Sequence, residues 1–156
     1  MLKHITLAFL AVLTLSGCKT SPRHTTDNNV AVLNTTHESS LAADFEKHAG
    51  DRVFFGFNKS DISSKAKETL HKQAKWLKNH SAVKATIAGH CDEKGTREYN
   101  LALGERRATA VQNFLLNQGI EANRLETISY GKEKPAVVGN DEAAWSQNRR
   151  AVTEIK

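Results

Sequence analysis

The sequence has little cysteine, little proline and few aromatic residues. Two of its 156 residues are Cys, two are Pro and nine are Gly, and aromatic residues make up 6%. Two cysteines are too few for a disulfide scaffold or a cysteine-rich zinc module, and the low Pro and Gly content excludes a collagen-like chain. A strong charge bias is also absent, with 22 basic and 17 acidic residues, which argues against a chain that is disordered throughout. One ordinary domain with appendages remains.

The N-terminus has no apolar run long enough to cross a bilayer. Ile5 to Leu15 is apolar and follows the basic pair Lys3-His4. A membrane-spanning helix needs about 20 apolar residues, whereas this shorter run is typical of a secretory signal. Leu15-Ser16-Gly17-Cys18 resembles the lipobox of bacterial lipoproteins. The sequence therefore predicts a signal peptide over residues 1–17 and lipid attachment to Cys18, with an ordinary signal peptide and a chance cysteine as the alternative.

The residue after Cys18 bears on the destination of the protein. In the enteric sorting rule, Asp at this position goes with retention in the inner membrane, and here the residue is Lys19. The two lipid signals of a bacterial lipoprotein suffice for a stable anchor. We therefore expect a protein anchored in the outer membrane and facing the periplasm. Cys91 then has no intrachain partner, and we expect it to be buried rather than to bridge to another chain.

A polar segment follows the lipobox. Residues 19–44 are rich in Thr, Ser, Asn and Asp, and their few apolar residues show no sustained period. Such a composition is typical of a flexible linker. We therefore expect a lipidated N-terminus and tether over residues 18–44 and one globular domain over residues 45–156.

Strand and helix patterns alternate within that domain. We expect strands over residues 53–57, 83–88, 124–130 and 150–155, helices over about 64–79 and 97–118, and a short helical turn over 142–148. The resulting order, β-α-β-α-β-(α)-β, predicts an α+β fold of the α/β sandwich type, with one mixed sheet and helices packed on one of its faces.

An arginine on the apolar side of the second helix is the strongest functional signal. At about 100° per residue, Arg107 and Gly104 lie within roughly 40° of the core-facing stripe, whereas Arg106 points to solvent. A buried guanidinium without a partner is costly, so an anionic group should meet Arg107. Gly104, one turn earlier, is expected to keep the approach to Arg107 open.

Asp92 is a candidate for the other side of the same pocket. It follows the second strand, in the loop that leads to the helix of Arg107, so the two residues should lie side by side. An acid and an arginine a few ångströms apart match a zwitterion, with the amine against the carboxylate and the carboxylate against the guanidinium. A structural Asp92–Arg107 salt bridge accounts for the same two residues equally well.

Residues 100–108, together with Val111, resemble the signature of the OmpA-like C-terminal domain family. Residues 89–100, 129–136 and 148–152 are similar to the peptidoglycan-associated lipoproteins within that family, and the resemblance covers about residues 53–152. It implies non-covalent binding to peptidoglycan, at the meso-diaminopimelate residue of peptide stems that are not cross-linked there. We expect neither a cofactor nor a metal, because the sequence has no His or Cys motif with metal-binding spacing.

The resemblance also implies a set of site residues. Asp92 would receive the amine of the ligand, Arg107 would hold its carboxylate, and Asn100 would help to shape the site. The opposite wall and the contact with the stem would come from three further residues, Phe57, Asn58 and Leu103.

Two positions depart from the family pattern. Asn58 stands where the family often has Asp, and Cys91 stands where Thr or Ala is usual.

The resemblance also implies protein partners. The family engages TolB, and through it the Tol system that acts in cell division. The loops that make this contact correspond here to the surroundings of Asn58, Asp92 and Lys132. A related lipoprotein that anchors the wall without Tol partners is the alternative.

An enzyme and a nucleic-acid binder are the rival classes. His90 and Cys91 are neighbours in an extended segment, so their side chains point to opposite faces and do not form a base and a nucleophile. The sequence has no His-Glu-x-x-His or Cys-x-x-Cys motif, and no convincing carboxylate pair for a peptidoglycan hydrolase. Its Arg pairs, Arg106-Arg107 and Arg149-Arg150, are interspersed with acids. We therefore expect a non-catalytic protein that binds no nucleic acid.

Overall fold

The computed structural model describes residues 27–156, with side chains from residue 38 onward. The predicted signal peptide over residues 1–17, the predicted lipid attachment at Cys18 and the tether up to residue 26 lie outside the described residues. Within the described part, no helix has both the length and the apolar character needed to span a membrane.

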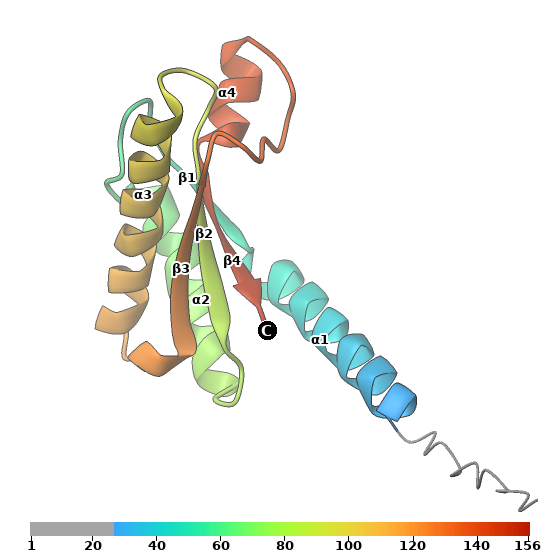
Figure 1. The fold of residues 1–156 in the computed structure, drawn as a ribbon. Helices are drawn as coiled ribbons and strands as arrows, with labels where there is room; N and C mark the ends of the chain where they lie inside the picture. The colour runs from blue at the N-terminus through green and yellow to red at the C-terminus, as the bar shows by residue number, and fades with distance from the viewer. Residues whose placement is uncertain (1–26) are drawn as a thin grey trace, which may run out of the picture.

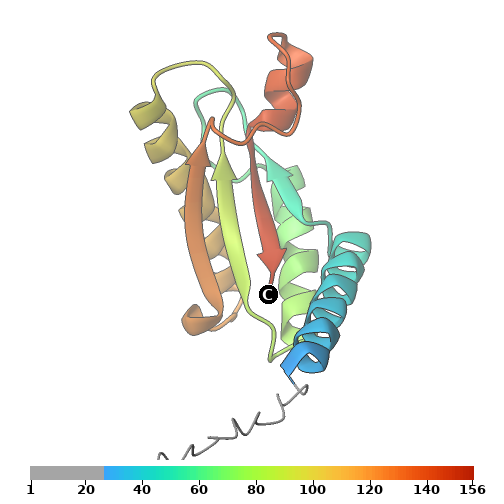
Figure 2. The same ribbon diagram turned by 45° about the vertical axis from the view of Figure 1, so that its right-hand side comes forward.

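Four strands form one mixed sheet. They are β1 (Arg52–Phe54), β2 (Ala85–His90), β3 (Leu125–Gly131) and β4 (Arg150–Ile155), in the order β1-β4-β2-β3. β2 and β3 are parallel, and β4 runs antiparallel to both β1 and β2. Helices α2 (Ser64–Asn79) and α3 (Arg97–Asn117) cover one face, and α4 (Glu142–Asn148) lies beyond the end of the sheet (Figures 1 and 2). The predicted α+β architecture is confirmed.

The helices begin where side-chain caps can hold their first turns. Ser63, Thr96 and Asp141 each accept a hydrogen bond from the backbone N–H three residues later, at the start of α2, α3 and α4 respectively. Such caps satisfy N–H groups that have no partner inside the helix. α3 ends just before Gly119, whose φ of +88° favours glycine. The predicted helix ranges are therefore confirmed to within a residue.

The hydrophobic core lies between the sheet and the two long helices. The predicted inner face of α2 is buried in full, and it consists of Ala66, Leu70, Ala74 and Leu77. β2 differs from the half-buried strand that its sequence alternation predicted, because all six of its residues are buried. β2 lies between β3 and β4, so the larger neighbours Ile128 and Val152 flank the small side chain of Ala88 on the face without helices.

The second part of the predicted tether is helical rather than flexible. Helix α1 (Asp27–Ala49) includes residues 27–44 of that tether and is followed by Gly50, whose φ is +76°. Its last turns pack on α2, where Phe45 is 1% exposed and meets the Trp76 ring edge-on at 5.0 Å. The indole N–H of Trp76 donates to the Asp44 carboxylate at 2.7 Å. Among the α1 residues with described side chains, Leu41 and Phe45 pack against the hydrophobic core.

Candidate functional site

A pocket of about 200 Å³ opens at the end of the sheet where β1 and β2 end and α3 begins. All six residues expected in the site line this pocket: Phe57, Asn58, Asp92, Asn100, Leu103 and Arg107. Four residues without a predicted role complete the lining: Cys91, Lys94, Gly95 and Tyr99. Tyr99 and Lys94 belong to the block of residues 89–100 on which the family resemblance rests, so that block held the signal for them.

Arg107 is completely buried on the inner side of α3. Its Nε–H donates to the carbonyl of Lys59 at 2.8 Å, Nη1 to that of His90 at 2.6 Å and Nη2 to that of Gly56 at 3.2 Å. A guanidinium has five N–H donors, so these three carbonyls leave donors for a ligand. Among the ion pairs of the described residues, none joins Arg107 to a carboxylate. Burial lowers the pKa of Arg107 below its ordinary value, as expected for a desolvated cation.

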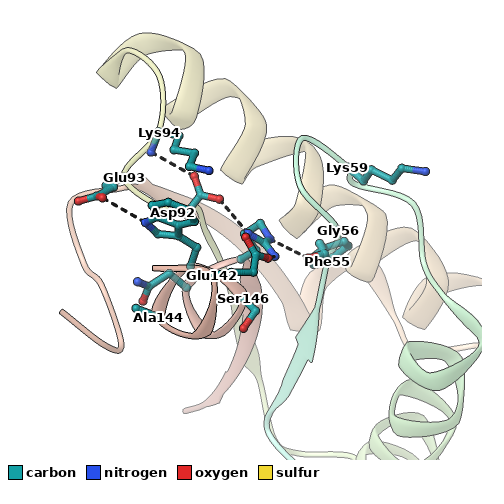
Figure 3. A network of polar contacts seen from close by, with 12 residues as sticks. Phe55, Gly56, Lys59, Asp92, Glu93, Lys94, Glu142, Ala144 and Ser146 are labelled. Carbon is teal, nitrogen blue, oxygen red and sulfur yellow. Dashed lines mark hydrogen bonds and ion pairs between the residues drawn. The ribbon is translucent and has the colours of Figure 1, made fainter. Parts of the chain in front are cut away.

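Asp92 is buried as well, but it is paired with a different arginine. Its Oδ2 accepts a hydrogen bond from Nη1 of Arg149 at 3.2 Å, and its Oδ1 accepts one from the backbone N–H of Lys94 at 3.1 Å (Figure 3). The alternative of a structural Asp92–Arg107 salt bridge is therefore wrong. The acid is oriented by its own partners, while Arg107 is held by carbonyl groups.

Arg149 connects Asp92 to α4. It is 6% exposed, and it also donates to the Glu142 carboxylate and, at 3.3 Å, to the carbonyl of Phe55. Burial by itself would lower the pKa of Arg149, but the hydrogen bonds that Arg149 donates to Glu142 and Asp92 outweigh this effect and raise the pKa. The bond from Arg149 lowers the pKa of Glu142. Arg149 has no role predicted from the sequence, although it lies in the block of residues 148–152 that resembles the family.

The loop that carries Asp92 is fixed from two sides. The buried amide of Asn100 donates to the carbonyls of Lys94 at 2.7 Å and Thr96 at 3.1 Å. From the turn that follows β3, Nζ of Lys132 donates to the carbonyl of Gly95 at 2.7 Å. Asn100 thus shapes the pocket through the backbone of this loop, and the loop is preorganised before any ligand arrives.

Aromatic and cationic side chains form the rim. Nζ of Lys94 lies 3.5 Å from the ring centroid of Trp145 and 5.3 Å from that of Phe57. The hydroxyl of Tyr99 donates to Oδ1 of Asn58, a residue whose φ of +57° is tolerated by Asn better than by most residues. Phe57 is 59% exposed, so it offers an apolar surface beside the pocket.

Cys91 and His90 do not form a catalytic pair. Cys91 is 2% exposed, its thiol donates to the carbonyl of Asn100 at 3.3 Å, and burial raises its pKa. The predicted burial of Cys91 is therefore confirmed. His90 is also buried, and burial together with the charge of Arg150 lowers its pKa to about 4. The Cys91 thiol therefore stays protonated near neutral pH, and His90, although neutral there, is too weak a base to activate it.

Gly104 serves packing rather than access to Arg107. A Cβ at this position would lie 2.3 Å from Oγ of Ser129 and 3.0 Å from the carbonyl oxygen of Gly89. A Cβ on Gly89 would in turn lie 1.8 Å from the carbonyl oxygen of Gly104. The two glycines allow α3 to lie directly on β2 and β3, which places Arg107 beneath the pocket.

The site therefore presents a buried cation and an oriented carboxylate to a small cavity. This arrangement suits a ligand that carries both an anionic and a cationic group. Across the residues with described side chains, no group of three or more His, Cys, Asp or Glu could hold a metal ion.

Sequence comparison with known proteins identifies the family of the chain. Residues 54–149 match the model of the OmpA family. The chain is 44% identical to the peptidoglycan-associated lipoprotein of Mesorhizobium japonicum, over 97% of this chain and 90% of that protein. It is 46% identical to that of Brucella melitensis, with the same coverage.

Solved structures show the same fold. The crystal structure of the peptidoglycan-associated lipoprotein from Burkholderia pseudomallei is 42% identical, with a TM-score of 0.66 over 68% of this chain and 90% of that one. The C-terminal domain of Helicobacter pylori MotB has a TM-score of 0.64 at 20% identity, over 68% of this chain and 84% of that one, which shows the fold alone. The chain belongs to the OmpA family, in the group of the peptidoglycan-associated lipoproteins.

Proposed function

We propose that this protein is a lipid-anchored, non-catalytic receptor for peptidoglycan, which binds the meso-diaminopimelate residue of peptide stems that are not cross-linked there. The relatives are named for peptidoglycan association and as lipoproteins. One observation carries the proposal: Arg107 is fully buried at the pocket and bonded to backbone carbonyls, with no carboxylate as an ion-pair partner among the described residues. A ligand carboxylate supplies the missing negative charge.

Binding uses two charged groups of opposite sign. The remaining N–H donors of Arg107 hold the carboxylate of the ligand, and the Asp92 carboxylate accepts from its amine. Because both protein groups are already buried and hydrogen-bonded, the ligand orders few additional side chains when it binds. Phe57, Asn58 and Leu103 contact the rest of the stem, and Asn100 keeps the loop of Asp92 in place.

The arrangement of the molecule suits a bridge between membrane and wall. The pocket lies at the end of the sheet where α3 begins, and α1 starts at Asp27 near the opposite end (Figures 1 and 2). Cys18, the proposed lipid site, precedes α1 in the sequence. The anchored domain therefore points its pocket away from the outer membrane, toward the peptidoglycan layer.

The proposed protein partners rest on the family resemblance and not on the geometry of the pocket. We propose that loops near Asn58, Asp92 and Lys132 bind TolB, and that the protein acts with the Tol system in envelope integrity and cell division. A purified TolB homologue from the same cells is expected to be retained by the immobilised protein. If it is not retained, the alternative of a wall anchor without Tol partners applies.

Sedimentation with purified sacculi that contain diaminopimelate tests the binding function. We expect Asp92→Ala and Arg107→Ala to lose co-sedimentation while their far-UV circular dichroism stays that of the wild type. Arg106→Ala is the matched control, because Arg106 is the exposed neighbour of Arg107 and should leave binding unchanged. If both variants co-sediment with the sacculi at wild-type levels, the assignment of Asp92 and Arg107 to the binding site is wrong. Release of soluble muropeptides over time would instead indicate an enzyme.

A further inference from the structure

We propose that Arg149 is a positioning residue, which holds the Asp92 carboxylate at its place in the pocket and apart from Arg107, so that both charges remain available to the ligand. This inference rests on the proposed function and deepens it. Arg149 is not among the residues that line the pocket, so it acts through Asp92 rather than by touching the ligand.

The contact between Arg149 and Asp92 is well shielded from water. The two side chains are 7% and 5% exposed, and Nη1 of Arg149 lies 3.2 Å from Oδ2 of Asp92. Ion pairs that are buried in this way are costly to break, because the remaining partner becomes an uncompensated charge. Asp92 without Arg149 must therefore find another cation or take up a proton.

Arg107 is the other buried cation close to Asp92. The two already interact, since the charge of Asp92 acts to raise the pKa of Arg107 against the larger opposite effect of burial. If Arg149 is removed, the freed carboxylate turns toward the unused donors of Arg107. The two ligand-binding charges then neutralise each other across the pocket, and the ligand has to separate them before it can bind.

Arg149 is itself held from two elements. Its Nε–H donates to the carbonyl of Phe55, just after β1, and its Nη2 donates to Glu142 in the first turn of α4 (Figure 3). Glu142 has a side chain that is 68% exposed, whereas Asp92 is buried. Loss of the bond between Arg149 and Asp92 should therefore weaken ligand binding more than loss of the bond between Arg149 and Glu142. Glu142 is thus a suitable control position.

A double-mutant cycle tests the inference. The probe is free meso-diaminopimelate, titrated by calorimetry into the detergent-solubilised full-length protein, its Arg149→Gln and Asp92→Asn variants, and the double variant. We expect Arg149→Gln to weaken binding about tenfold and Asp92→Asn to weaken it more. We expect the double variant to bind no more weakly than Asp92→Asn alone, since Arg149 acts only through Asp92.

Further variants separate positioning from general damage. Arg149→Lys keeps a cation beside Asp92 and should recover part of the affinity, and Glu142→Gln should change it less than threefold. In a ¹⁵N spectrum, the side-chain Nε–H signal of Arg107 should move in Arg149→Gln and return toward its wild-type position when Asp92→Asn is added. If Arg149→Gln does not fold, Arg149→Lys takes its place in the cycle.

The outcomes are distinct. Absence of binding by the wild-type protein refutes the proposed function itself. If the wild type binds and the effects of the two substitutions multiply, or if Arg149→Gln binds like the wild type, the positioning role of Arg149 is wrong. An Arg149→Lys variant that binds no better than Arg149→Gln also contradicts it.

Discussion

At Arg107 the chain buries a full positive charge against carbonyl dipoles instead of against an acid. The three carbonyls come from two separate segments, since Gly56 and Lys59 follow β1 and His90 ends β2. Their partial charges hold the guanidinium in place without cancelling its charge, which leaves an attraction for anions in a poorly solvated cavity. The same residue thus organises two loops and provides the binding charge.

Replacement of Gly104 should damage the packing of α3 on the sheet near the site. We expect Gly104→Ala to lower the free energy of unfolding by about 2 kcal/mol, because its Cβ would collide with Ser129 and with the backbone of β2. Urea denaturation measures this change. Gly56→Ala is the control, since its Cβ would meet only the flexible side chain of Lys59 at 3.4 Å, and it should stay within about 0.5 kcal/mol of the wild type. Equal stability of Gly104→Ala and wild type would refute the close packing of α3 on the sheet.

His90 should make the free energy of unfolding depend on pH, beginning at a higher pH than the titration of ordinary carboxylates. Its pKa is about 4 in the folded protein, against an ordinary value near 6.5, so the unfolded chain binds a proton that the folded protein rejects. Stability is therefore full above pH 6.5 and falls as the pH drops toward 4, by roughly 3 kcal/mol at most. Urea denaturation at pH 7 and pH 5 detects the loss. His90→Leu, which keeps the carbonyl that Arg107 uses, should remove most of it, and an unchanged pH profile in this variant would contradict the assignment.

At the scale of elements, local sequence was sufficient for most of the fold. The ranges of α2, α3, α4 and β4 follow from cap residues, a glycine stop and the apolar spacing within each segment. All of these signals lie within a few residues of the boundary that they define. β2 was less well predicted, because its burial on both faces depends on which strands lie beside it.

The N-terminal cap of α3, Thr96, is one of these local signals, and it directly follows the pocket residue Gly95. We expect Thr96→Ala to lower the free energy of unfolding by about 1 kcal/mol, because the threonine hydroxyl accepts from the backbone N–H of Tyr99 at 3.2 Å. Thr96→Ser keeps the hydroxyl and is the matched control. Chemical denaturation of both variants checks the prediction, and an alanine variant as stable as the serine variant would show that the cap contributes nothing.

At the scale of the whole molecule, α1 extends the domain beyond the boundary that composition indicated. Leu41, inside the predicted tether, packs against the same hydrophobic core as Phe45 and Leu70, although residues 19–44 have the composition of a linker. The end of α1 is thus an integral layer of the fold, on the side of α2 (Figure 2).

Loss of this contact should destabilise the whole domain. We expect Phe45→Ala to lower the free energy of unfolding by about 3 kcal/mol, because a fully buried aromatic side chain leaves a cavity against Trp76. Thermal and chemical denaturation measure the effect. Glu46→Ala, at the neighbouring exposed position, should be close to neutral. If the two variants are equally stable, α1 is not part of the cooperative unit.

The sequence by itself determined the helices α2, α3 and α4, the strand β4 and the presence of a buried arginine on α3, since each depends on the periodicity of neighbouring residues. The strand predicted over residues 53–57 is shorter in the structure, where β1 is Arg52–Phe54, and the strand predicted over residues 83–88 is shifted to Ala85–His90. The family resemblance also identified six site residues in advance, and all six line one pocket. Only the tertiary structure decided that Asp92 pairs with Arg149, 57 positions away along the chain, and that Arg107 is left to carbonyl groups. Such pairings depend on how the ends of β1, β2 and α4 come together, and the periodicity of neighbouring residues does not encode distances between segments so far apart.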